Sequence, residues 1–262
     1  MPPTDNVTKP ALLECDTLIR AQALLRMSNP YFRFKQFTVF HDRCAMKVGT
    51  DGTLLGAWTD ITGVQSILDI GTGTGLVALM LAQRSQAHID AVEIDAEACI
   101  QAQENVARSP WRDRIQVYQG SVQDYATTCS KRYDLIVSNP PFFDNASKAS
   151  QKARTVARHS DSLKQLDLLQ VTEKLLGENG RLAVIYPTEA AQIFQEKAEQ
   201  FAFFCRRKLS VKPTLASQTK RIILELGKHQ LSSQENVLAI EATRRVYTPE
   251  FISLIKDFYL KY

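Results

Sequence analysis

The order of its apolar segments constrains the fold of this chain more than any other feature. From residue 65 onwards, short apolar runs of strand length alternate with longer runs of helical periodicity. Such alternation is typical of a doubly wound, mostly parallel sheet, which places the chain in the α/β class. The predicted strands cover residues 65–70, 89–94, 114–118, 133–138 and 181–186, and the predicted helices cover residues 76–84, 96–108, 163–176 and 189–200, with Gly177 and Gly180 ending the third of them.

The two ends of the chain depart from this alternation. Strand patterns at 203–211 and 220–227 leave no room for a helix between them, so we expect an antiparallel hairpin that closes the sheet. A strand at 236–241 and a helix at 249–259 follow it. Before the sheet, residues 32–40 alternate as a short strand does, and a helix at 53–58 is expected to be capped by Thr50 or Asp51.

These patterns suggest how the chain is divided. Residues 1–27 are expected to be disordered or a marginal helix, and residues 28–262 to form one domain. Within that domain, residues 28–62 would make a lid-like extension of a hairpin and a helix, and residues 63–262 the core.

Composition excludes several classes of protein. The net charge of +4 permits a nucleic-acid partner without requiring one. The five cysteines include no C-x-x-C pair, which argues against a zinc site and against a disulfide framework. No apolar run is long enough to span a membrane. We therefore expect a cytoplasmic protein, a monomer or a weak dimer, with no metal and no membrane partner.

A glycine-rich turn follows the first strand of the predicted sheet, in the run Asp69-Ile70-Gly71-Thr72-Gly73-Thr74-Gly75. Its G-x-G-x-G spacing differs from the G-x-G-x-x-G of dinucleotide enzymes, and it suits S-adenosylmethionine better than a pyrophosphate. Glu93 ends the second strand, where a carboxylate can accept hydrogen bonds from ribose hydroxyls. Asp95 is expected to cap the next helix. Asp124, after the third strand, can accept from an adenine amino group or cap a helix or turn, and both interpretations stay open.

A stiff corner ends the fourth strand, in the run Ser138-Asn139-Pro140-Pro141-Phe142. The prolines lack backbone N–H groups and cannot continue the strand. The Asn139 side-chain oxygen and the Pro140 carbonyl would accept the two hydrogens of an exocyclic amine, while Phe142 would stack on its base. Such a corner catalyses by positioning and electrostatics. The alternative, in which the prolines only begin a loop, is left open by these residues alone.

Together, residues 69–75, Glu93, Asp124 and residues 139–142 resemble class I S-adenosylmethionine-dependent methyltransferases, which have a Rossmann-like fold and act on exocyclic amines. The closer resemblance is to bacterial tRNA1(Val) (adenine-N6)-methyltransferases. It rests on Phe34-Lys35-Gln36-Phe37, on the block from His41 to Gly52, on Leu55-Gly56-Ala57-Trp58, on Asn139-Pro140-Pro141-Phe142-Phe143, on Arg154 and Ala157-Arg158-His159, and on Thr219-Lys220-Arg221. It covers the chain from about residue 32 to the C-terminus. Many relatives have tyrosine where this chain has Phe142.

The resemblance implies methylation of the 6-amino group of an adenine in the anticodon loop of tRNA (valine tRNA, adenine 37), with S-adenosylmethionine as donor. The implied catalytic residues are Asn139, Pro140, Pro141 and Phe142. The implied donor site comprises Lys47, Thr50, Asp69, Gly71, Gly73, Gly75, Glu93, Asp124 and Asn139. The RNA contacts are assigned to Lys152, Arg154, Arg158, His159, Lys220 and Arg221, the first four within a basic segment after the corner.

Four other functions share some of these features. Methyltransferases of the guanine 2-amino group in ribosomal RNA and of release-factor glutamine also use an Asn-Pro-Pro-aromatic corner, but the block at residues 47–52 favours the tRNA adenine interpretation. A catalytically inactive RNA-binding scaffold is disfavoured because the donor loop and the corner are both intact. A dehydrogenase-like domain is disfavoured by the glycine spacing.

Overall fold

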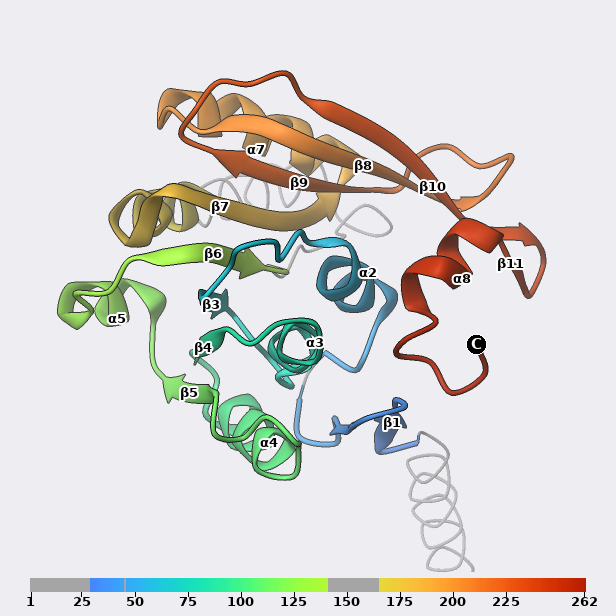
Figure 1. Cartoon of the computed structure of the whole chain (residues 1–262), viewed down its shortest axis with the longest axis horizontal. Coiled ribbons are helices and arrows are strands. Elements are labelled where there is room, and N and C mark those ends of the chain that lie inside the picture. The colour runs from blue at the N-terminus through green and yellow to red at the C-terminus, as the bar shows by residue number, and fades with distance from the viewer. Residues whose placement is uncertain (1–28, 45, 141–164) are drawn as a thin grey trace, which may run out of the picture.

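The computed structural model describes residues 29–44, 46–140 and 165–262 (Figure 1). Its main sheet has nine strands in the order β11-β10-β8-β9-β7-β6-β3-β4-β5, and helices cover both faces. The doubly wound α/β prediction is therefore confirmed. The expectations for residues 1–27 lie outside the described residues. The parallel strands are β3 (Ser66–Ile70), β4 (His88–Glu93), β5 (Ile115–Gln119), β6 (Tyr133–Ser138) and β7 (Leu176–Pro187). The helices between them are α3 (Leu76–Arg84), α4 (Ala96–Ala107) and α5 (Val122–Thr128), and residues 165–175 are helical before β7.

The C-terminal part of the sheet is larger than expected. After α7 (Thr188–Gln200), β8 (Phe204–Thr214) and β9 (Arg221–Gly227) form the predicted antiparallel pair. They do not close the sheet, because β10 (Gln234–Thr243) pairs parallel with the outer edge of β8. Leu209 of β8 and Leu238 of β10 are buried in one apolar cluster, and this shared burial favours the pairing of β10 with β8. The short strand β11 (Val246–Tyr247) and helix α8 (Pro249–Ile255) follow.

The prediction that Gly177 and Gly180 end a helix is wrong. Residues 165–175 are helical, but Gly177 and Gly180 lie inside β7 rather than ending the helix. A Cβ atom at Gly180 would stand 2.8 Å from the backbone oxygen of Tyr133. The register of β6 and β7 shifts at Tyr133, so the glycine permits a close approach of backbone at an irregularity of the sheet.

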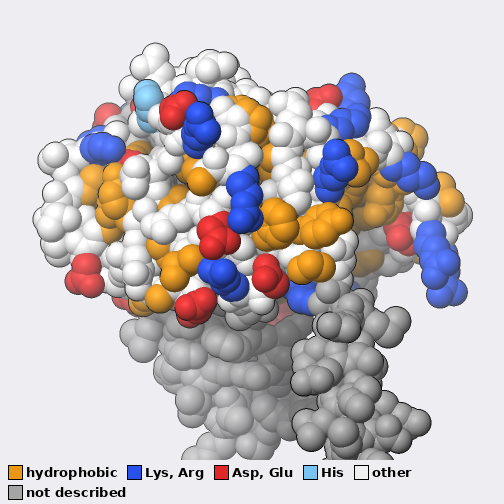
Figure 2. Space-filling model, turned by 90° about the horizontal axis from the view of Figure 1, so that it is seen from below, with side chains coloured by type: hydrophobic (Ala, Val, Ile, Leu, Met, Phe, Trp, Pro, Cys, Tyr) orange, Lys and Arg blue, Asp and Glu red, His pale blue; other side chains and the backbone are white. Residues whose placement is uncertain are grey.

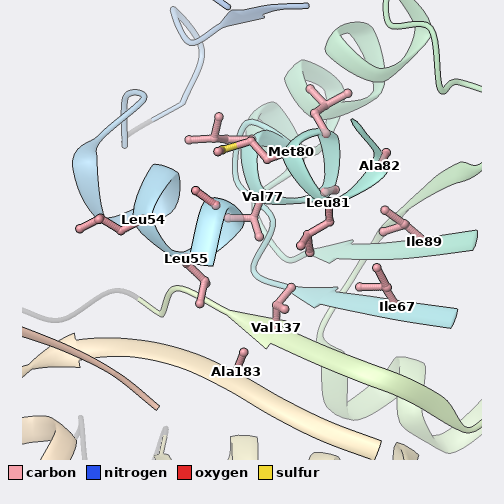
Figure 3. Packing of buried hydrophobic residues seen from close by; sticks show 14 of the residues in the cluster. Leu54, Leu55, Ile67, Val77, Met80, Leu81, Ala82, Ile89, Val137 and Ala183 are labelled. Carbon is pink, nitrogen blue, oxygen red and sulfur yellow. The ribbon is translucent and has the colours of Figure 1, made fainter. Parts of the chain in front are cut away.

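Two apolar layers cover the faces of the sheet. Alternate residues of each strand enter one or the other, as Ile67 and Leu68 do in β3. The layer containing Ile67 is formed with α3, α4 and α8, together with an N-terminal helix, α2 (Thr50–Trp58). Figure 3 shows Leu55 of α2 and Val77 and Leu81 of α3 pointing toward strands β3, β4, β6 and β7. The opposite layer contains α5, residues 165–175 and α7.

The segment before the sheet forms a hairpin and a helix. Residues 32–40 are two strands, β1 (Tyr31–Arg33) and β2 (Thr38–Phe40), rather than one. Helix α2 begins at Thr50, and its N-cap is Gly49 with no side-chain cap, so the expected capping by Thr50 or Asp51 is wrong. Both of those residues already lie in the first helical turn.

Helix α2 is held close to α3 from one side and to β9 from the other. A Cβ atom at Gly56 would stand 2.9 Å from the Met80 side chain, so the two helices approach at that glycine. At the end of α2, buried Glu225 of β9 accepts a hydrogen bond from the backbone of Asp60 (2.6 Å) and from Arg207 (2.8 Å). This arrangement fixes α2 over the sheet.

The outer surface carries mixed charge. Lys, Arg, Asp and Glu side chains are interspersed with hydrophobic side chains over the described part of the face in Figure 2. No helix within the described ranges is both long and apolar enough to cross a membrane.

Candidate functional site

The predicted site residues converge at the carboxyl ends of β3, β4 and β6. The parallel register places Ser138 beside Ile70 and Ile70 beside Val92. Ser138 Oγ donates to the backbone oxygen of Ile70 at 2.9 Å, which ties the two strand ends together. Asn139 and Gly71 each follow one of these adjacent ends. In open α/β sheets this edge is where ligands bind.

The glycine-rich turn leaves open space in front of its backbone. Gly71 and Gly73 have φ angles of +69° and +57°, in the left-handed region that favours glycine. A Cβ atom added at either would meet nothing within 4 Å. Gly75, also with a positive φ, is the N-cap of α3. The turn therefore presents bare backbone at a helix N-terminus, a place suited to a ligand.

Asp69 supports the turn from beneath. Its Oδ2 accepts hydrogen bonds from Thr72 Oγ1 (2.6 Å) and from the backbone of Ala78 (3.2 Å). Burial raises the pKa of the Asp69 carboxyl to about 7, against the opposite effect of these hydrogen bonds, and the charge of Glu93 raises it further. With only 1% of its surface exposed, Asp69 holds the turn in shape instead of lining its open side.

Glu93 is bonded to the same turn from β4. Its Oε2 accepts from the Gly73 backbone N–H at 2.8 Å, and its Oε1 accepts from the Asp95 backbone N–H at 2.9 Å. Asp95 caps α4 as predicted, accepting from Ala98. The next residue after Glu93 is Ile94, whose side chain is 71% exposed. Sequence reasoning missed Ile94, although an apolar residue directly after the strand's terminal acid was a visible signal.

Asn105 is a second residue that the sequence interpretation missed. This fully buried side chain of α4 donates from Nδ2 to the backbone oxygens of Phe40 and Thr74, both at 2.9 Å, and accepts from the Phe40 N–H. It therefore joins the β2 strand to the glycine-rich turn. An asparagine inside a helix is unfavourable for helix formation, which was the available signal.

Asp124 serves as a helix cap partner. It lies in the first turn of α5, where Ser121 is the N-cap; Ser121 Oγ and the Asp124 carboxylate are 2.6 Å apart, and the Asp124 N–H donates to Ser121. The capping interpretation is thus present in the structure. Asp124 is exposed, so a role toward an adenine ring stays a prediction.

The corner after β6 carries an unsatisfied acceptor. Asn139 Oδ1 is buried and has no hydrogen-bond partner. Its Nδ2 lies beside α2, since a Cβ atom at Gly52 would stand 3.8 Å from it. A buried acceptor without a partner costs free energy, about 1–3 kcal/mol, unless a ligand supplies the donor. Pro140 is half-buried beside it, whereas Pro141 and Phe142 lie outside the described residues.

The segment between β2 and α2 runs beside the end of β4. Burial raises the pKa of the Cys44 thiol to about 11, and the charges of Glu93, Asp95 and Asp42 raise it further. Lys47 and Thr50 are exposed in this segment. On β9, Lys220 is exposed just before the strand, and Arg221 donates from Nε to Asp51 at 2.8 Å. The other assigned RNA contacts, Lys152, Arg154, Arg158 and His159, lie outside the described residues.

Similarity to known proteins covers most of the chain. A family model described as "Methyltransferase small domain" matches residues 53–192. A protein of Trichodesmium erythraeum, named tRNA1(Val) (adenine(37)-N6)-methyltransferase, is 64% identical over 90% of this chain and 100% of its own length. A protein of the same name from Parabacteroides distasonis is 48% identical over the same shares. Among solved structures, an Agrobacterium tumefaciens protein described as a predicted O-methyltransferase shares the fold, with a TM-score of 0.59, 17% identity and coverage of 79% of this chain and 96% of that one.

Proposed function

The chain belongs to the family of tRNA1(Val) (adenine(37)-N6)-methyltransferases, and from that premise we propose that it transfers a methyl group from S-adenosylmethionine to the 6-amino group of an adenine in the anticodon loop of a valine tRNA, adenine 37. Work on tRNA would place it in the cytoplasm. The observation that carries the proposal is the buried, partnerless Oδ1 of Asn139 at the edge of the sheet that also presents the glycine-rich turn.

The residues at this edge fit S-adenosylmethionine. The open space at Gly71 and Gly73 allows an amino-acid nucleoside to approach the backbone closely. Glu93 keeps acceptor capacity for ribose hydroxyls, because each carboxylate oxygen has more than one lone pair. The exposed Ile94 side chain offers an apolar surface to an adenine ring. The donor, when bound, supplies an electrophilic methyl group on a sulfonium.

In the donor site we also place Lys47, Thr50, Gly75 and Asp124. Asp69 acts there by supporting the turn through Thr72 and Ala78. The division into a lid-like extension at 28–62 and a core at 63–262 belongs to the same proposal, with Lys47 and Thr50 as the part of the extension that faces the donor.

Asn139 would act on the target amine. An exocyclic amine of adenine is a weak nucleophile because its lone pair is delocalised into the ring. Accepting hydrogen bonds at Asn139 Oδ1 and at the Pro140 carbonyl orients the amine and localises the lone pair toward the methyl carbon. As the new nitrogen–carbon bond formed, the carbon–sulfur bond of the donor would break, and the methylated amine would lose its extra proton to solvent. The chain contributes position and hydrogen bonding, with no nucleophilic side chain.

The RNA would be held by residues on both sides of the corner. Phe142 would stack on the everted base, and anticodon-loop bases are less costly to unstack than paired ones. Lys152, Arg154, Arg158, His159 and Lys220 are assigned to the surrounding phosphates, where cations confer salt-dependent affinity.

One experiment tests the function directly. The protein is incubated with labelled S-adenosylmethionine and an unmodified valine tRNA transcript, and the digested nucleosides are separated. We expect label in 6-methyladenosine, and its loss when the target adenine is replaced by guanine in the transcript. Label in a guanine nucleoside or in a glutamine of added protein would instead support one of the two related activities. Donor binding without any transfer would support the inactive scaffold.

A further inference from the structure

Two neighbouring cations that the sequence assigns to RNA differ in their surroundings. Lys220 is exposed. The Arg221 side chain is only 28% exposed, and its Nε lies 2.8 Å from Oδ2 of Asp51, which is itself 24% exposed. The arginine therefore already pairs with a carboxylate of its own chain.

This ion pair lies at the catalytic edge of the sheet. Arg221 is the first residue of β9, and the antiparallel register pairs it with Pro187 at the carboxyl end of β7. Asp51 lies in the first turn of α2. The pair thus ties the beginning of α2 to the sheet two strands away from the corner on β6.

The beginning of α2 also contacts the catalytic amide. Gly52 follows Asp51, and a Cβ atom there would lie 3.8 Å from Asn139 Nδ2 and 3.0 Å from Leu76 Cδ2. Helix α2 therefore backs the nitrogen side of the Asn139 amide, while Oδ1 remains buried without a partner. A shift of this first turn would change the direction of the acceptor.

We propose that the Arg221–Asp51 ion pair positions Asn139 for methyl transfer by holding the first turn of α2 against the catalytic corner. Arg221 is then a positioning residue that acts through Asp51 and Gly52, and Lys220 alone of the two cations faces RNA. The inference rests on the proposed function only in that Asn139 is taken as the ligand of the target amine. Small displacements of such a ligand reduce turnover strongly, because the reacting atoms must stay in a near-attack geometry.

Removal of the Arg221–Asp51 ion pair by mutation should leave α2 folded and packed on the sheet. A second connection at the other end of α2, from Glu225 to Asp60 and Arg207, does not involve Arg221. An ion pair that is about a quarter exposed still has access to solvent and contributes little to global stability, and Asp51 remains favourable at a helix N-terminus without its partner. The variants are therefore expected to report on turnover more than on folding.

The test is a double-mutant cycle measured on valine tRNA at saturating S-adenosylmethionine. The variants are Arg221→Ala, Asp51→Asn, their combination, and the reversed pair Asp51→Arg with Arg221→Asp. We expect each single variant to lower kcat about tenfold with the KM for tRNA within about twofold. The combination should be no worse than either single change, and the reversed pair should recover most of kcat. Glu235→Gln, which breaks the Lys208–Glu235 pair on β8 and β10, is the control and should leave kcat within about twofold.

Several outcomes would overturn the proposal. A raised KM for tRNA in Arg221→Ala, with Asp51→Asn unaffected, would make Arg221 a direct RNA contact. If the two single effects on kcat multiply in the combined variant, the two residues act independently and not as a pair. Unchanged kcat in both single variants would show that the pair does not act on turnover. The product of the wild-type protein is identified in the same assay. A product other than 6-methyladenosine would reject the proposed function. The kcat values of the variants for the reaction that is observed would still test the role of the ion pair.

Discussion

The backbone N–H of Gly73 donates to Oε2 of Glu93 at 2.8 Å, so the acid at the end of β4 and the turn after β3 form one unit. The other carboxylate oxygen accepts from Asp95 and thereby also holds the start of α4. A residue assigned to the ligand from its position in the sequence thus has a second task, which is to fix the loop that the ligand would approach.

Replacing Glu93 by Gln should lower donor affinity. The amide keeps one acceptor oxygen, so either the Gly73 or the Asp95 N–H loses its partner. Hydrogen bonds to charged groups contribute about 1.5–3 kcal/mol, which corresponds to a loss of roughly tenfold to a hundredfold in affinity. Calorimetric titration with S-adenosylmethionine measures this. The exposed acid Asp113, changed to Asn, is the control; equal affinity of E93Q and wild type would remove Glu93 from the donor site.

Replacing Asn139 by Ala should reduce turnover and spare donor binding. Removing one aligned hydrogen-bonding group from a reacting centre typically costs about 10²–10³-fold in kcat. The dissociation constant for S-adenosylmethionine should stay within about threefold, because the donor is held mainly by the turn and β4. Single-turnover methylation and titration separate the two. Asn179→Ala, at an exposed amide, is the matched control. A collapse of donor affinity in N139A would mean that Asn139 belongs chiefly to the donor site.

Asp69 should make stability depend on pH. Its pKa is about 7 in the fold, against an unfolded value near 3.9. Between about pH 4 and pH 7 the folded protein therefore binds a proton that the unfolded chain lacks. The free energy of unfolding should fall as pH rises through this window and level off above it. Asp69→Asn should lack this component. Denaturant titrations of both proteins from pH 5 to 8 measure the difference, and parallel profiles would contradict the raised pKa.

Replacing Gly56 by Ala should destabilise the protein by forcing α2 away from α3. The added Cβ would stand 2.9 Å from Met80, and overpacking of this kind costs about 1–3 kcal/mol. Thermal unfolding monitored by circular dichroism measures the loss. At Gly49, the N-cap of α2, an added Cβ meets only the Lys47 backbone oxygen at 3.7 Å, so Gly49→Ala changes the cap without overpacking and is the control for losses that have another cause. An unchanged melting temperature for G56A would show that the helices separate at little cost.

The strands and helices that the sequence predicted best are those with strong local signals. Helix α3 and strand β6 match their predicted bounds, since an apolar helix follows the glycines and two prolines end the strand. The short elements α5 and β11 were not predicted, because seven and two residues carry too little periodicity. The place of β10 beside β8 was also missed, since pairing order depends on which edge remains apolar after folding.

The candidate site was predictable as far as motifs extend. The glycines, Glu93 and the Asn139 corner can be recognised in the sequence because they stand at characteristic spacings at the ends of predicted strands. Asn105 and the Arg221–Asp51 ion pair do not, because their partners are distant in sequence and no local pattern connects them. Such contacts appear only when the strands are in register.

The segment before the sheet is locked by the last residues of the chain. Lys35 donates to the backbone oxygens of Lys256 and Tyr262, and Phe34 pairs with Tyr259. During synthesis on the ribosome, Phe34 and Lys35 therefore cannot make these contacts until residues 256–262 have been made. A nascent chain can assemble the donor half of its sheet before that point, but its N-terminal hairpin lacks these contacts until the later residues emerge, so shorter nascent chains would lack the fully assembled enzyme.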